Sequence, residues 1–237
     1  MKIVLDTHAH TLASGHAYNT IREMAKAAAD KGLEAIALTD HAPDMPGSCH
    51  LFYFQNLRVV PRNQCGVKLF LGTEANILDE NGSVDLPDSV LAEMDLVIAS
   101  IHPPCYKGAK TKKDITNAYL AAMENPYIDI IGHPDDGRFM VDYEAIVKKA
   151  KETHTLLELN NSSLRPGGFR VNTRENDLEM LRLCKKYEVP ISIGSDAHVD
   201  VDLAGFDLAM EVLKECEFPE ELVVNTSLER LEKILAI

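Results

Sequence analysis

The residues of this sequence best suited to chemistry are its nine histidines, most of which stand in short motifs. The motifs are Asp6-Thr7-His8-Ala9-His10, Thr39-Asp40-His41, Ile101-His102-Pro103, Gly132-His133-Pro134 and Gly194-Ser195-Asp196-Ala197-His198, with His16 and Glu74 standing apart. Residues two apart on a strand share a face, so we expect His8 and His10 to point the same way. Imidazole and carboxylate ligands suit Zn²⁺, Mn²⁺ and Fe²⁺, and the motifs therefore indicate a metal site.

Short apolar runs precede these motifs and are predicted to position them. The runs expected to be strands are Lys2–Asp6, Ala35–Leu38, Val67–Leu71, Leu96–Ala99, Ile128–Ile131, Leu156–Leu159 and Ile191–Ile193. Helical spacing predicts helices over Thr20–Lys31, Leu51–Val60, Asp88–Glu93, Lys112–Met123, Tyr143–Thr153, Asn176–Tyr187 and Leu203–Lys214. Asn81-Gly82 predicts a hairpin turn, and Leu222–Val224 and Leu228–Leu235 a small extra strand and helix.

Strands that alternate with helices predict a parallel sheet, and seven such units favour a closed or nearly closed (β/α) barrel over an open doubly wound sheet. We expect one domain over residues 1–237. The chemistry of such barrels gathers at the C-terminal ends of the strands. The motifs fall at these ends, so the predicted barrel and the predicted metal site support each other.

The candidate ligands are too many for one ion. They are His8, His10, His16, His41, Glu74, His102, His133, Asp196 and His198. A single histidine is more often a satisfied core or surface group, but this pattern repeats at the same end of five strands. Two or three ions fit the set, with Glu74 as the natural bridge because a carboxylate has two oxygens. Bridged ions form the two-metal site of phosphatases and nucleases.

Composition excludes several other classes of protein. Acidic residues number 37 against 24 basic ones, a net charge of −13, which argues against a protein that grips the nucleic acid backbone. No apolar run is long enough to span a membrane, and MKIVLDTHAH is too short and polar for a signal peptide. Five scattered cysteines indicate reduced thiols. We therefore expect a cytoplasmic protein that does not associate with membranes.

The ordered motifs resemble those of the PHP (polymerase and histidinol phosphatase) family. His16-Ala17-Tyr18 and Asn160-Asn161-Ser162-Ser163 look especially like its stand-alone YcdX-type phosphatases. The resemblance implies a distorted (β/α)7 TIM-like barrel with three metal ions, usually zinc, while Mn or Fe also suits some sites. It assigns His8, His10, Glu74 and Asp196 to the first ion. Glu74, His102 and His133 would hold the second, and His16, His41 and His198 the third.

The resemblance also implies hydrolysis of a phosphate monoester, in which a hydroxide bridging two metals attacks phosphorus. Glu74 and Asp196 would act catalytically as ligands, and Asp40 is a candidate for the general acid or for orienting a ligand. Arg165 and Arg170 are candidates for gripping the phosphate, with Arg174 in the same loop. The expected substrate is a small phosphorylated metabolite. The sequence leaves open which one, and whether copies of the chain form a homo-oligomer.

Several other functions compete with this one. Histidinol-phosphate phosphatase shares the chemistry, and one sequence does not separate that substrate from others. A phosphodiesterase or nuclease would be expected to carry a basic track. An amide hydrolase on a related barrel commonly uses a carbamylated lysine where Glu74 stands here. A metal-binding regulator without catalysis is the fourth alternative, and an intact ligand set argues against it.

Overall fold

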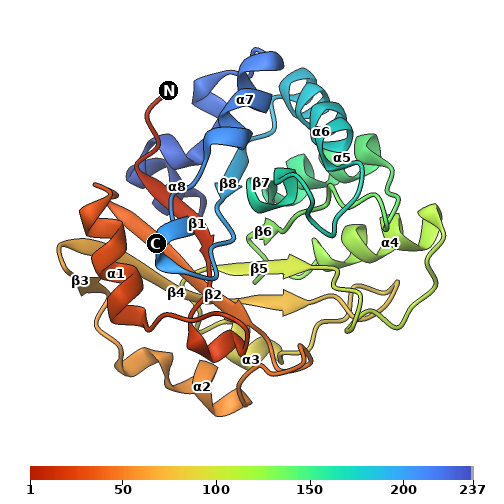
Figure 1. Ribbon diagram of the computed structural model, residues 1–237. Coiled ribbons are helices and arrows are strands. Elements are labelled where there is room, and N and C mark those ends of the chain that lie inside the picture. The colour runs from red at the N-terminus through yellow and green to blue at the C-terminus, as the bar shows by residue number, and fades with distance from the viewer. Residues whose placement is uncertain (236–237) are drawn as a thin grey trace.

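Parallel strands joined by helical crossovers form a sheet that curls until its first and last strands meet (Figure 1). The computed structural model describes residues 1–235. The strands lie in the order β1-β2-β4-β5-β6-β7-β8, with β3 antiparallel at the start of β4. Their bounds are β1 Leu5–Ala9, β2 Ala35–His41, β3 Asn63–Gln64, β4 Val67–Asn76, β5 Val97–Ser100, β6 Ile130–Ile131, β7 Leu156–Asn160 and β8 Ile191–Gly194. The predicted barrel is confirmed.

Two sets of contacts draw β1 and β8 together and nearly close the barrel. At the C-terminal end, the His10 amide donates to the Ala197 carbonyl and the Asp196 amide to the His8 carbonyl, each at 2.9 Å. At the other end, the Asn225 side chain donates to the carbonyls of Leu5 and Ile193 at 3.1 and 2.8 Å. The amide thus stands in for a missing strand pairing.

The helices surround the sheet, as Figure 1 shows. They are α1 Ile21–Asp30, α2 Leu51–Asn56, α3 Asp88–Leu91, α4 Lys112–Ala122, α5 Tyr143–Thr153, α6 Thr173–Tyr187, α7 Asp207–Glu215 and α8 Leu228–Ile234. Short 3-10 turns occupy Leu12–Ser14, Leu57–Val59, Ser162–Leu164, Asp200–Asp202, Glu220–Leu222 and Val224–Thr226. Side-chain caps fix several starts: Thr20 and Glu23 form a capping box on α1, and Thr111 and Asp142 cap α4 and α5.

The core has two parts, divided by the sheet. Outward residues of the strands, such as Leu69 and Leu71 of β4, pack against the helices. Inward residues such as Phe70 and Ile98 form a smaller cluster that includes Leu231 of α8. The lower half of the barrel interior is therefore apolar and leaves the C-terminal half for polar side chains.

Several predicted boundaries were wrong by a few residues. β1 begins at Leu5 and runs to Ala9, later than the predicted Lys2–Asp6, and a register irregularity lies between Asp6 and Ala9. The predicted strand at Leu222–Val224 is a pair of 3-10 turns with a single bridge from Val223 to Ile191.

At the predicted helix Leu203–Lys214, α7 starts only at Asp207, because Ala204 has a positive φ of 55°. The two-residue strand β3 was not predicted, because it is too short to show a periodic pattern. Within residues 1–235, no helix is both long and apolar enough to cross a membrane.

Candidate metal centre

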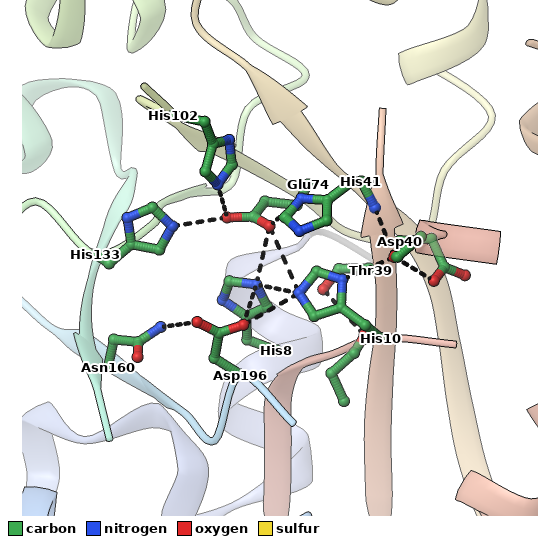
Figure 2. A network of polar contacts seen from close by, with 12 residues as sticks. His8, His10, Thr39, Asp40, His41, Glu74, His102, His133, Asn160 and Asp196 are labelled. Atoms are coloured by element: carbon green, nitrogen blue, oxygen red, sulfur yellow. Dashed lines mark hydrogen bonds and ion pairs between the residues drawn. The ribbon is translucent and has the colours of Figure 1, made fainter. Parts of the chain in front are cut away.

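Glu74, near the end of β4, lies at the centre of the site, and histidines from four other strands and their following loops surround its carboxylate (Figure 2). It is 1% exposed. Its Oε1 lies 2.9 Å from Nε2 of His133 and 3.1 Å from Nε2 of His102. Its Oε2 lies 2.8 Å from Nδ1 of His41, and 3.4 and 3.5 Å from Nε2 of His8 and His10. Both oxygens thus face ring nitrogens, as a carboxylate bridging two ions requires.

Asp196 faces Glu74 across the His8–His10 pair. Its Oδ1 lies 3.2 Å from Nε2 of His10 and 3.8 Å from Nε2 of His8. The two Nε2 atoms of His8 and His10 lie only 3.1 Å apart, which confirms that these side chains share a face. Asp196 and His133 have positive φ angles of 53° and 30°. Such backbone angles in residues other than glycine gather at functional sites, where the surrounding structure holds them.

His16 and His198 form the outer part of the cluster with His41. The His16 ring centroid lies 4.9 Å from both of the other rings. The His10 ring links this group to the centre, at 4.3 Å from His198 and 4.4 Å from His41. His16 is exposed and the side chain of His198 is 28% exposed, whereas His8 and His10 are fully buried. The structure therefore brings all the predicted ligands together.

The buried atoms of this cluster fit a cation better than they fit one another. Nδ1 of His41, Nε2 of His102 and Oε2 of Glu74 are buried, and despite their short contacts within the cluster none has the geometry of a hydrogen bond to a described residue. Three groups place one ligand atom per residue within 4.8 Å of one another: His10, His41 and His198; His8, His10 and Glu74; His41, Glu74 and His102. Buried polar atoms left unpaired are costly, and a bound metal ion would satisfy them.

Polar groups behind the cluster fix which nitrogen three of the histidines turn inward. Nδ1 of His8 donates to Oε1 of Glu158 at 2.7 Å. Nδ1 of His102 donates to Oδ1 of Asn76 at 2.7 Å. Nδ1 of His198 donates to the Asp196 carbonyl at 3.0 Å. In each case the Nε2 lone pair is left free, as metal binding needs.

Asp40 acts on the cluster from behind rather than from within it. Its carboxylate accepts hydrogen bonds from the Thr11 amide and hydroxyl, the Ser14 hydroxyl and the Tyr53 hydroxyl, each at 2.7 Å. Because the Ser14 hydrogen goes to Asp40, Ser14 Oγ must accept from Nδ1 of His10, 3.0 Å away. Asp40 is 1% exposed and all four contacts are donors, so they favour a positioning role over the predicted general acid.

Asp6, by contrast, ties the backbone together. Its Oδ1 accepts from the amides of Ser195 and His8 at 3.0 and 3.3 Å, and its Oδ2 accepts from Ala204 at 3.0 Å. It therefore joins the first and last strands of the barrel near the ligands without contacting an imidazole.

The charges of the centre are strongly coupled. Burial alone would raise the pKa of Glu74, but His102, His41 and His8 hold that pKa well below its ordinary value. Burial and the neighbours His41 and His198 push the pKa of His10 well below normal, which favours the neutral form that binds metals.

His8 shifts the other way. Burial opposes its charged form, yet Glu158, Glu74 and Asp196 raise its pKa well above the ordinary value. The three carboxylates around His8 thus favour a positive charge at this position, which a metal ion would provide.

A cavity of about 480 Å³ opens above the outer histidines. This volume suits a small metabolite. The predicted phosphate-binding residues Arg165 and Arg170 both line it, whereas Arg174 does not and pairs with Glu215 on the surface.

Arg170 is the better placed of the two predicted arginines. Its side chain is 9% exposed, and it donates to Oδ2 of Asp196 at 3.2 Å and to the Ser163 hydroxyl at 2.9 Å. Arg165 is 42% exposed and pairs with Asp202 at 2.9 Å, farther from the ligands.

Sequence reasoning gave no role to Glu158 and Asn76, which hold His8 and His102. Glu158 is fully buried and also accepts from the His133 amide at 2.8 Å and from Asn160 Nδ2 at 3.1 Å. The available signal was an acidic residue inside the apolar strand sequence LLELN. A Cβ on Gly194 would lie 2.0 Å from Oε1 of Glu158, so glycine keeps room for this contact.

The family comparison matches residues 6–164 of the chain to the model of the PHP domain. The last two candidate ligands, Asp196 and His198, lie beyond that range but follow β8 of the same barrel. Among curated proteins, one named "probable phosphatase" from Caldicellulosiruptor saccharolyticus is 49% identical over 237 residues, which cover 100% of this chain and 98% of that protein. A probable phosphatase of Clostridium novyi is 44% identical, over 98% of this chain and 93% of its own length.

A solved structure shares the fold at low sequence identity. It is histidinol phosphate phosphatase from Lactococcus lactis, in complex with zinc, L-histidinol and phosphate. The TM-score is 0.63 at 18% identity, and the match covers 91% of this chain and 94% of that one.

Proposed function

The chain belongs to the PHP domain family, and from that premise we propose that it is a metal-dependent phosphatase acting on monoesters of small metabolites. One observation carries the proposal. Glu74 lies buried with ring nitrogens of His133 and His102 on one oxygen and of His41 on the other. Arg170 lines the cavity that His41 and His102 also line. This combination of clustered ligands and a buried arginine suits a phosphate group.

We propose that three ions bind, with zinc as the principal metal. The family's pattern would give the first ion His8, His10, Glu74 and Asp196. The second would take Glu74, His102 and His133, and the third His16, His41 and His198. In support, His102 and His133 approach one oxygen of Glu74, whereas His8 and His10 approach the other. The ring distances of 4.9 Å around His16 support the third group. The Lactococcus structure supports zinc, while manganese and iron also accept this ligand chemistry.

When bound, such ions lower the pKa of a coordinated water for attack on phosphorus and neutralise the phosphate oxygens. The residues of this chain do the remaining work. Arg170 binds a phosphate oxygen with the guanidinium edge that reaches the cavity, held in place by Asp196 and Ser163. Glu158 and Asn76 keep the Nε2 lone pairs of His8 and His102 directed at the centre. Glu74 and Asp196 supply negative charge without contacting the leaving group.

Histidinol-phosphate phosphatase is a second candidate, favoured by the Lactococcus neighbour of the same fold. A phosphodiesterase or nuclease is less well supported, because the net charge of −13 does not favour a polyanionic substrate. We further propose that the whole chain works as one domain, since ligands from both ends of the sequence meet at one centre. Its five free thiols support a cytoplasmic location.

The test is to measure metal content per chain by plasma emission spectrometry, together with phosphate release from an aryl phosphate monoester and the matching diester. Two to three ions and chelator-sensitive turnover of the monoester would support the proposal. Turnover of the diester alone would favour the phosphodiesterase. Bound metals with no turnover of either ester would contradict a general phosphatase. A chain that cannot be loaded with zinc or manganese would contradict the metal centre itself.

A further inference from the structure

The cavity above the metal centre is lined by arginine far more than by acid. Arg138, Arg165 and Arg170 all contribute to it. Among residues 1–235, Asp196 supplies the one carboxylate of the lining, and it is already engaged by Arg170 and His10, each at 3.2 Å. A ligand entering this cavity therefore meets positive charge beyond what one phosphate needs.

Arg138 and Arg165 each keep donors free for a ligand. Arg138 pairs with Asp136 through Nε and one terminal nitrogen, and Arg165 donates one terminal N–H to Asp202 at 2.9 Å. Neither of these acidic partners lines the cavity. Nη1 of Arg138 and both Nε and Nη2 of Arg165 have no protein acceptor within residues 1–235. Because a guanidinium has five N–H donors, the free edges can bind a second anionic group.

The lining also contains apolar residues, among them one exposed aromatic ring. Phe169 is 71% exposed, and the guanidinium carbons of Arg138 and Arg170 lie 5.2 and 5.3 Å from its ring centroid. Pro103 and Pro104 belong to the same lining. The two cation–π contacts hold the exposed ring in the cavity lining, where it offers a surface for the carbon skeleton of a substrate.

We propose that the phosphate monoester hydrolysed at this site carries a second anionic group on its leaving group, a carboxylate or another phosphate, bound by Arg138 and Arg165. This inference rests on the proposed phosphatase function. It also separates the two candidate functions, because a leaving group bearing an ammonium, such as that of histidinol phosphate, would find no free carboxylate in the cavity. Burying a charge beside like charges disfavours that substrate.

The experiment compares three aryl phosphate monoesters as substrates of the metal-loaded protein. They are phenyl phosphate, 4-carboxyphenyl phosphate and 4-(aminomethyl)phenyl phosphate. kcat/KM is measured for the wild type, for Arg165→Gln and for Arg174→Gln. Arg174 is the matched control because it forms a surface pair with Glu215 and is 50% exposed, much as Arg165 pairs with Asp202. Ratios between esters within one variant show selectivity, and comparing the ratio across variants cancels the reactivity of each ester.

In the wild type we expect the carboxylated ester to be preferred over the aminomethyl ester by tenfold or more. Arg165→Gln should lower the carboxylated-to-phenyl ratio by about tenfold, the effect of losing one charge-assisted hydrogen bond. Arg174→Gln should keep the wild-type ratio. An unchanged ratio in Arg165→Gln, or a wild-type preference for the aminomethyl ester, would overturn the inference.

Binding of non-hydrolysable analogues tests the inference independently of catalysis. Phenylphosphonate and 4-carboxyphenylphosphonate are titrated calorimetrically into the metal-loaded protein and into Arg165→Gln. Tighter binding of the carboxylated phosphonate that depends on Arg165 supports the second anion site even if no ester is hydrolysed, in which case the proposed function fails alone. Equal binding of both phosphonates, with the monoesters still hydrolysed, rejects the anion site and leaves the phosphatase in place.

Discussion

Replacing Glu158 by glutamine tests whether this buried carboxylate sets the affinity of the metal centre. Oε1 accepts from Nδ1 of His8 at 2.7 Å, and Oε2 accepts from the His133 amide at 2.8 Å and from Asn160 at 3.1 Å. Both sides of the carboxylate face donors. A glutamine amide has only one acceptor oxygen, so whichever way it turns, its NH2 group meets an N–H.

The size of the effect follows from that mismatch and from the lost charge. Glu158 is the largest electrostatic influence that raises the pKa of His8, so its removal makes His8 a weaker metal ligand. Residues that orient metal-bound histidines in this way are typically worth 10- to 100-fold in metal affinity, about 1.4 to 2.8 kcal/mol. We expect Glu158→Gln to weaken zinc binding within that range and to lower turnover at limiting zinc.

The assay is equilibrium dialysis against chelator-buffered zinc, followed by metal analysis of the protein. Glu215→Gln, which removes a surface carboxylate paired with Arg174, is the matched control and should bind zinc as the wild type does. Thermal unfolding of the metal-free proteins shows whether Glu158→Gln still folds. A folded Glu158→Gln protein whose zinc affinity lies within twofold of wild type would refute the reasoning, because packing alone would then orient His8.

Three further perturbations test other parts of the structure. Glu74→Ala should lose at least one ion and all measurable hydrolysis, and full metal content with normal turnover would rule out the bridging role. Arg170→Gln should raise KM about tenfold with unchanged metal content, because it removes a charge-assisted contact to phosphate rather than a ligand; an unchanged KM would place Arg170 outside substrate binding. Burial raises the pKa of Asp129 to about 7, so the folded chain holds a proton that the unfolded chain has lost between pH 4 and 7, and stability falls as pH rises through that window. In urea unfolding of the metal-free protein, Asp129→Asn should therefore gain about 1.5 kcal/mol at pH 5 and at most about 4 kcal/mol at pH 8; an equal gain at both pH values would contradict the raised pKa.

The candidate ligands could be placed together from sequence because each lies at the C-terminal end of a strand or in the loop that follows it. His41 is the last residue of β2, Glu74 lies near the end of β4, and His102 follows β5, so strand prediction alone brings them to one end of a barrel. The small errors at β1 and α7 did not disturb this logic. The end of a buried apolar run can be recognised from the local sequence, so it can be predicted without knowledge of tertiary contacts.

The partners behind the ligands could not be predicted, since they depend on contacts between distant segments. Glu158 contacts His8 across 150 positions of the sequence. Ser14, which contacts His10, donates to Asp40, 26 residues after Ser14. The same holds for the two arginines of one loop. Arg170 turns inward because Ser163 and Asp196 accept its N–H groups, while Arg165 remains on the rim with Asp202. Nothing in the loop sequence distinguishes them.

The division of the barrel interior predicts that metal binding and substrate choice are separable properties of this chain. Phe70, Gly72 and Glu74 are successive inward positions of β4. Phe70 belongs to the apolar cluster, whereas Glu74, four residues later, lies in the candidate metal centre. Sheet register therefore fixes most ligands, whereas Arg138, Arg165 and the exposed ring of the cavity stand on loops. Loops tolerate substitution far better than paired strands. Changes in these loops should thus redirect the protein toward other phosphate esters while the metal centre stays intact, which is the arrangement expected of a fold that serves many substrates with one chemistry.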